Sequence, residues 1–128
     1  MKDYSRILEA SKRNSLQRII NIGSDQKLNE WNILRLLEEM SGRMRDNLDS
    51  VMDEPWKHHV SGVKLEMAEF KGKGRRLMLK AQIYRVSNQE LTLKVFAHEL
   101  MADGKAVRVA RAIYQIKVSR AFPKGRAA

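Results

Sequence analysis

Three carboxylate side chains in or beside one predicted helix are the residues best suited to acid–base chemistry. Asp25 precedes the helix, Glu30 falls in its first turn, and Glu38 lies two turns further along. A carboxylate can activate water as a base or attack an electrophilic carbonyl directly. The N–H groups at a helix start can hold the oxyanion that develops in such a reaction. These three residues are therefore candidates for a site that activates water.

Each acid also has an ordinary structural interpretation. The sequence Ser-Asp after a glycine is common in turns, which would explain Asp25. Glu30 would stabilise the positive end of the helix dipole. Glu38 would form an exposed ion pair with Arg35, three residues earlier on the same face.

Among these acids, Glu38 has a distinctive place on the helix surface. Helical spacing puts it beside Leu34, Ser41 and Arg45, at the border of the apolar stripe. A border carboxylate that faces a shared cleft is suited to act as a base. The neighbouring Glu39 is interpreted as solvated, because arginines stand four residues before and after it.

The helix that positions these acids is predicted over residues 29–48. Asn29 is a suitable N-terminal cap, and Glu30 favours the first turn through the helix dipole. The apolar residues recur at steps of three and four, which is the period of one helical face. This stripe consists of Ile33, Leu37, Met40, Met44 and Leu48.

After Trp56 the apolar period changes to two, which indicates β-strands. A first strand is expected before the helix, and a tight hairpin is expected at residues 102–104. One helix followed by a meander of strands predicts an α+β fold, a long antiparallel sheet that buries one face on the helix. The expected strands are 16–22, 58–70, 75–86, 90–101 and 105–119, with a short helix over 2–14 and a loose basic tail over 121–128.

The composition narrows the class of protein. The chain has 128 residues, which suits a single domain over residues 1–128 with a core of about 16–120. No cysteine and no long apolar run are present, so a cytoplasmic protein without a membrane span is expected. His58 and His59 are adjacent and His98 is isolated, so no metal site is predicted.

The loop and helix around Asp25 and Asn29, with the step Leu36-Leu37-Glu38-Glu39, resemble a segment of the 4-hydroxybenzoyl-CoA-type thioesterases of the hotdog fold. The segment after residue 61, including the stretch DGKAVRVARA, resembles the trailing strands of that family. The resemblance covers roughly residues 16–120. It lies in the layout of the elements more than in catalytic residues.

This resemblance implies a single hotdog domain and a homodimer or tetramer with active sites at the subunit interface. It implies hydrolysis of the thioester of an acyl-CoA or an acyl carrier protein, with Glu38 or Asp25 as base or nucleophile. Glu38 is our first choice, because the match to the family around it needs no gap. The helix start, with Asn29 and Glu30, would form the oxyanion hole, and Leu34 and Ser41 would contact the substrate. No cofactor is implied, because coenzyme A is part of the substrate.

A basic cluster stands at one predicted turn. Lys71, Lys73, Arg75 and Arg76 fall within six residues, and the resemblance makes them a candidate clamp for CoA phosphates or an acidic carrier protein. The ordinary alternative is a solvated turn. The formal net charge of +10 indicates an anionic partner of some kind or a charge that serves solubility.

Two other functions stay open. Departures from the family pattern at the helix entrance, such as Glu30 where a second asparagine is usual, favour a non-catalytic protein that binds acyl-CoA as a sensor or partner. A nucleic-acid-binding domain would account for the net charge. We rank it last because residues 71–80 contain no aromatic side chain to interleave with the charges.

Overall fold

A computed structural model describes residues 15–22, 29–51, 56–68, 76–87 and 90–120 of the chain. The predicted helix 2–14 and tail 121–128 lie outside these residues. The described elements are β1 (Leu16–Asn21), α2 (Glu30–Val51), β2 (Trp56–Met67), β3 (Arg76–Ser87), β4 (Glu90–Leu100) and β5 (Ala106–Arg120).

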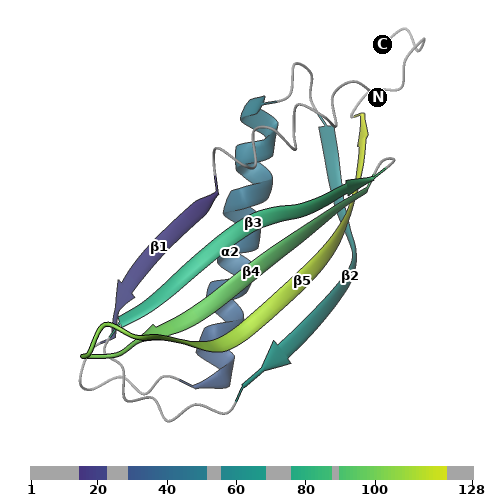
Figure 1. Cartoon of the computed structure of the whole chain (residues 1–128). Helices are drawn as coiled ribbons and strands as arrows, with labels where there is room; N and C mark the ends of the chain where they lie inside the picture. The colour runs from purple at the N-terminus through teal and green to yellow at the C-terminus, as the bar shows by residue number, and fades with distance from the viewer. Residues whose placement is uncertain (1–14, 23–28, 52–55, 69–75, 88–89, 121–128) are drawn as a thin grey trace, which may run out of the picture.

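The strands form one antiparallel sheet in the order β1-β3-β4-β5-β2, with α2 across one face (Figure 1). The helix packs mainly against β3, β4 and β5. This is the predicted α+β arrangement of one helix and a long antiparallel sheet.

The start of α2 is fixed by the predicted cap. The backbone N–H of Asn32 donates to Oδ1 of Asn29 over 2.9 Å, and the N–H of Ile33 donates to the carbonyl oxygen of Asn29 over 3.1 Å. The helix ends at Val51, three residues beyond the predicted end at Leu48. Residues 49–51 contain no glycine or proline, so nothing in them opposes this extra length.

Replacing Asn29 with alanine should lower the free energy of unfolding by about 1 kcal/mol, because the N–H of Asn32 loses its acceptor. Urea denaturation followed by circular dichroism measures the loss. Asn29→Asp is the matched control, because aspartate keeps the acceptor and should retain wild-type stability. Equal stability of all three proteins would contradict the capping role.

The core lies between α2 and the inner face of the sheet. The predicted helical stripe is buried as far as the side chains are described, at Ile33, Leu37, Met40 and Met44. The sheet contributes alternate residues, as the period of two predicted. Its buried apolar side chains include Leu77, Leu79, Ala81, Ile83, Leu91, Leu93, Val95, Ala97, Ala112, Tyr114, Ile116 and Val118.

The strand ends differ slightly from those predicted. The largest difference is in β2, which was expected over 58–70 but runs from Trp56 to Met67. Pairing with the long strand β5 explains the early start, because Trp56 is opposite Arg120. A bulge between Val60 and Gly62 shifts the register within this pairing.

The hairpin between β4 and β5 lies where the sequence predicted it. The N–H of Gly104 donates to the carbonyl oxygen of Met101 over 3.0 Å, and Oδ1 of Asp103 accepts from the N–H of Lys105 over 3.0 Å. Gly104 has a φ of 88°, a conformation that a residue with a Cβ adopts only with strain.

The described residues also limit membrane and metal binding. Among them, α2 is too polar to cross a membrane. Within the same residues, no three histidine, aspartate or glutamate side chains gather closely enough to hold a metal ion.

Candidate active site

An open groove runs along the exposed flank of α2. It is lined by Trp31, Leu34, Arg35, Glu38 and Glu39, which recur at steps of three and four and so share one side of the helix. Trp31 is 68% exposed, although an indole ring is usually found largely covered in a protein. The groove thus combines an uncovered apolar wall with a carboxylate.

The Glu38 carboxylate is held from two sides. The hydroxyl of Tyr114 donates to Oε2 over 3.3 Å, and a guanidinium nitrogen of Arg45 lies 3.9 Å from Oε1. The Glu38 side chain is still 66% exposed. The observed cation partner is therefore Arg45, one of the neighbours that helical spacing predicted, and not Arg35.

Tyr114 anchors this arrangement from the sheet. It lies on β5 among residues that face α2, and it is buried. Burial raises the pKa of the Tyr114 hydroxyl, and the charge and hydrogen bond of Glu38 raise it further. Tyr114 therefore stays protonated at physiological pH and remains a hydrogen-bond donor to Glu38.

Exposed apolar side chains on the edge strand β2 lie close to Tyr114. Val63 is opposite Tyr114 and Leu65 is opposite Ala112, so both are on the helix-facing side of the sheet. They are nevertheless 57% and 37% exposed. The inner face of β2 therefore offers uncovered apolar surface near the Glu38–Tyr114 pair, suitable for an acyl chain or a second copy of the protein.

The start of α2 provides backbone donors. The Asn29 side chain is occupied by the N–H of Asn32. In the described part of the chain, no acceptor is seen for the N–H groups of Glu30 and Trp31. These are the donors that an oxyanion would use at a helix N-terminus.

The two parts of the candidate site are separated along the helix. Glu38 is eight residues from Glu30, which corresponds to about 12 Å of helix rise. A single carbonyl group cannot contact both the helix start and the Glu38 carboxylate of the same chain. If both act on one substrate, they must come from two copies of the chain.

Only some of the other residues predicted from the sequence to form the site lie near Glu38. Leu34 lines the groove with Glu38, and Glu30 is exposed at the helix start. Ser41 is fully buried toward the core, and its hydroxyl has no hydrogen-bond partner among the described residues. Glu39 forms ion pairs with Arg18 and Arg43, at 3.6 and 3.8 Å, in the partly solvated position expected of it.

The predicted basic cluster falls largely outside the described residues, as do Asp25 and the neighbouring turn. Lys71, Lys73 and Arg75 are not described, whereas Arg76 opens β3 and is exposed. By alternation with the buried Leu77, Arg76 belongs to the outer face of the sheet, opposite the helix. It therefore does not line the Glu38 groove.

One residue of the site, Tyr114, was missed by the sequence analysis. Tyr114 lies on β5, where alternate residues face the helix. The one sign in the sequence was a residue with a hydroxyl group among apolar residues that alternate along this strand. Trp31 was not missed, because the resemblance already made residues 28–31 of the helix start part of the site.

No protein-family model matches the sequence, and no curated protein matches it. Solved structures do resemble it. A thioesterase family protein from Silicibacter pomeroyi is 13% identical, with a TM-score of 0.63 over 91% of this chain and 98% of that one. A variant of 4-hydroxybenzoyl-CoA thioesterase in complex with 4-hydroxybenzoyl-CoA is 12% identical, with a TM-score of 0.63 over 89% and 91%.

A third similar structure is an acyl-CoA hydrolase variant from Staphylococcus aureus, 8% identical, with a TM-score of 0.67 over 93% of this chain and 71% of that one. At such identities the likeness establishes the fold. The hotdog fold that the sequence resemblance implied is therefore confirmed, and thioesterases are among the structures that share it.

Proposed function

From this hotdog fold and its helix groove, we propose that the protein hydrolyses the thioester of an acyl-CoA or an acyl carrier protein. The observation that carries the proposal is the Glu38 carboxylate, held by Tyr114 and Arg45 at an open groove next to uncovered apolar surface. The groove suits an acyl group, and the carboxylate suits the attack on its carbonyl carbon. Coenzyme A enters as part of the substrate, and no cofactor is required.

In this reaction Glu38 takes a proton from water or attacks the thioester carbon itself. Tyr114 and Arg45 keep its carboxylate in place, which reduces the reorganisation needed during the reaction. The N–H groups of Glu30 and Trp31 hold the oxyanion. When Glu38 acts as a base, water adds to the carbonyl carbon, the carbon–sulfur bond breaks, and the proton held by Glu38 passes to the departing thiolate. When Glu38 attacks directly, the thiolate leaves with a proton from solvent, and water then hydrolyses the mixed anhydride to release the carboxylic acid and restore Glu38.

The separation of about 12 Å between these groups leads us to propose a homodimer or higher assembly. In it, the helix start of one copy faces Glu38 of the other. The second copy would also cover exposed apolar surface, including Trp31, Val63 and Leu65. Asp25 stays the alternative acid, because it precedes the helix start in the sequence, where the family resemblance implies a catalytic aspartate.

A thiol-release assay tests the proposed function. The purified protein is mixed with short, long and aryl acyl-CoA esters, and free thiol is followed with a thiol-reactive dye. We expect turnover above the spontaneous rate for at least one ester, under cytoplasmic pH and salt. Absence of turnover across the panel and with acyl carrier protein esters would contradict the proposal.

A non-catalytic acyl-CoA sensor is the second candidate. The high exposure of Glu38 favours it, because a catalytic base usually acts in a site from which water is excluded. Calorimetric titration with a CoA ester separates the two functions. Saturable binding without thiol release supports the sensor, whereas thiol release supports the enzyme.

Replacing Tyr114 with phenylalanine should lower kcat about tenfold, with little change in KM. The ring keeps the packing, but Glu38 loses the donor that holds Oε2. Steady-state kinetics over a pH series measure the change. Because a merely structural role would lower stability and leave kcat per folded molecule unchanged, urea denaturation of the same variant is the control.

A further inference from the structure

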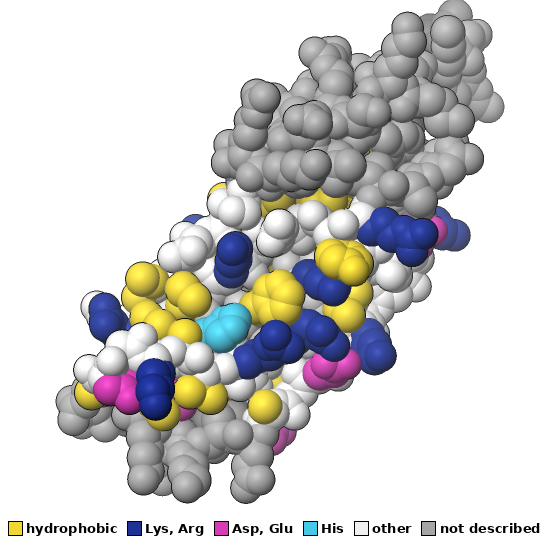
Figure 2. Space-filling view, viewed as in Figure 1, with side chains coloured by type: hydrophobic (Ala, Val, Ile, Leu, Met, Phe, Trp, Pro, Cys, Tyr) yellow, Lys and Arg dark blue, Asp and Glu magenta, His cyan; other side chains and the backbone are white. Residues whose placement is uncertain are grey.

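The outer face of the sheet, opposite α2, carries a strong excess of positive charge. Alternation along each strand places these cations on one surface. Figure 2 shows dark-blue Lys and Arg side chains spread between yellow hydrophobic ones over this face. They include Lys64, Lys80, Lys94, Arg108, Arg111 and Lys117, whereas the acids described on this face are Glu66 and Glu90.

Aromatic side chains lie among these cations. The ammonium nitrogen of Lys94 lies 3.5 Å from the ring centroid of Tyr84, and the guanidinium of Arg108 lies 5.5 Å from that of Phe96. Tyr84 is 63% exposed, which leaves much of its ring open to a ligand. The sheet therefore presents rings and cations side by side. In both pairs the ring and the cation come from neighbouring strands.

The strand register explains how this surface forms. Phe96 of β4 lies between Lys80 of β3 and Arg111 of β5 in one cross-strand row. In the next row His98 is opposite Arg108. Burial, then the charges of Arg108 and Lys80, lower the pKa of His98, so at neutral pH it is a neutral ring among cations.

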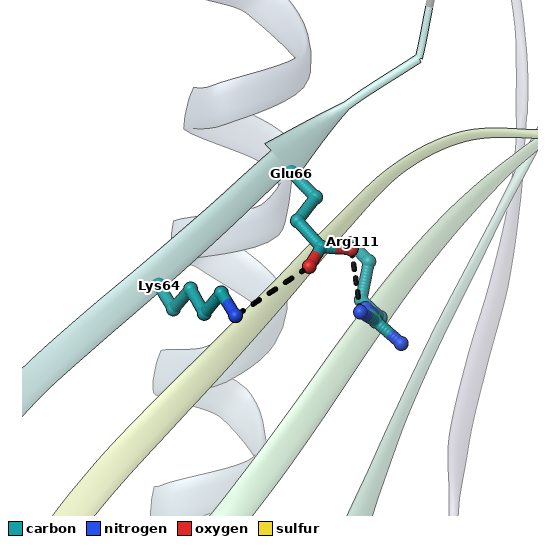
Figure 3. A network of polar contacts seen from close by, with 3 residues as sticks. All are labelled: Lys64, Glu66 and Arg111. Carbon is teal, nitrogen blue, oxygen red and sulfur yellow. Dashed lines mark hydrogen bonds and ion pairs between the residues drawn. The ribbon is translucent and has the colours of Figure 1, made fainter.

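Acidic side chains do little to cancel the charge. Glu66 is bound by Arg111 and lies 3.8 Å from the ammonium group of Lys64, so two cations share one carboxylate (Figure 3). Self-association through this face would bring like charges together and is disfavoured. An anionic partner is the complement of such a surface.

We propose that this outer face binds single-stranded nucleic acid, with bases stacking on Tyr84 and Phe96 and phosphates contacting Lys80, Lys94, Arg108 and Arg111. Aromatic rings interleaved with cations on an open surface are typical of proteins that bind single strands without sequence preference. An anionic membrane would need the charges but not the rings. This function is separate from thioester hydrolysis, because the Glu38 groove lies on the other side of the sheet.

The test is fluorescence anisotropy with a labelled oligothymidylate of about a dozen nucleotides, over a series of salt concentrations. Tyr84→Ala should weaken binding about tenfold, with an unchanged salt dependence, and Tyr84→Phe should bind like the wild type. Lys94→Ala and Arg108→Ala should each reduce the slope of log K against log salt by about 0.7.

Arg43→Ala is the matched control, because it removes one exposed cation from α2 on the other face. It should leave the affinity within about twofold of wild type, as expected for a distant site. Three results would overturn the proposal: no saturable binding at low salt, equal losses for Arg43→Ala and Arg108→Ala, or no effect of Tyr84→Ala. A fourth result would also overturn it. In that case, Lys94→Ala and Arg108→Ala would lose binding to phosphatidylserine vesicles but keep wild-type affinity for the oligonucleotide.

Discussion

Replacing Glu38 with glutamine should lower kcat for thioester hydrolysis about a hundredfold or more, and should leave the fold and substrate binding intact. The side-chain volume is nearly unchanged, and the amide oxygen can still accept the hydrogen bond from Tyr114. What is lost is the basicity and charge of the carboxylate. Steady-state kinetics with the best acyl-CoA substrate measure the effect, and a loss confined to kcat identifies a group that acts in the transition state.

Two matched variants make this result specific. Glu39→Gln removes the neighbouring carboxylate, which is paired with Arg18 and Arg43, and should change kcat by less than about threefold. Asp25→Asn tests the alternative acid. If Asp25→Asn loses more activity than Glu38→Gln, the catalyst is Asp25. Hydrolysis by Glu38→Gln at the wild-type rate would exclude Glu38 as the base.

Replacing Leu37 with alanine should lower the free energy of unfolding by about 2–5 kcal/mol. Leu37 is 0% exposed and belongs to the helical stripe that packs on the sheet. The truncation removes buried apolar surface and leaves a cavity, because the strands around it cannot fully close. Urea denaturation followed by circular dichroism measures the loss.

Leu37→Met is the control for this prediction, because it nearly conserves volume and should cost less than about 1.5 kcal/mol. Leu34→Ala is a second control on the same helix, since Leu34 lines the open groove and is only partly buried. A loss at Leu37 no greater than that at Leu34 would contradict the proposed core.

The fold could be predicted because its signals are local and periodic. The steps of three and four pick out the buried apolar residues described on α2, which are Ile33, Leu37, Met40 and Met44. The alternation in residues 91–97 picks out the buried side of β4. The cap at Asn29 could also be predicted, because it depends on one side chain next to the helix. Strand ends could not be predicted to the residue, since they depend on how far the partner strand extends.

The site was harder to predict because its contacts join distant parts of the chain. The sequence placed Glu38 beside Arg45, which is a contact within one helix. It gave no sign of the hydrogen bond from Tyr114, which lies 76 residues away and meets Glu38 only when β5 packs on α2. Sequence spacing within a helix predicts neighbours, but it does not predict which strand residue faces them.

The outer face of the sheet illustrates the same limit. Residues 71–80 contain several cations and no aromatic residue. In the sheet, Phe96 of β4 is opposite Lys80 of β3, and Arg108 of β5 lies over its ring. Charge and rings are therefore combined by strand pairing and not by sequence proximity.

A crystal structure with a non-hydrolysable acyl-CoA analogue, in which a methylene group replaces the thioester sulfur, tests the central claim most directly. We predict that the analogue's carbonyl oxygen accepts hydrogen bonds from the N–H groups of Glu30 and Trp31 of one copy. The Glu38 carboxylate of a second copy should then lie within about 3–3.5 Å of the carbonyl carbon or of a water aligned with it. An acyl group bound away from the helix start, or a complex in which no Glu38 carboxylate approaches the carbonyl, would contradict the account.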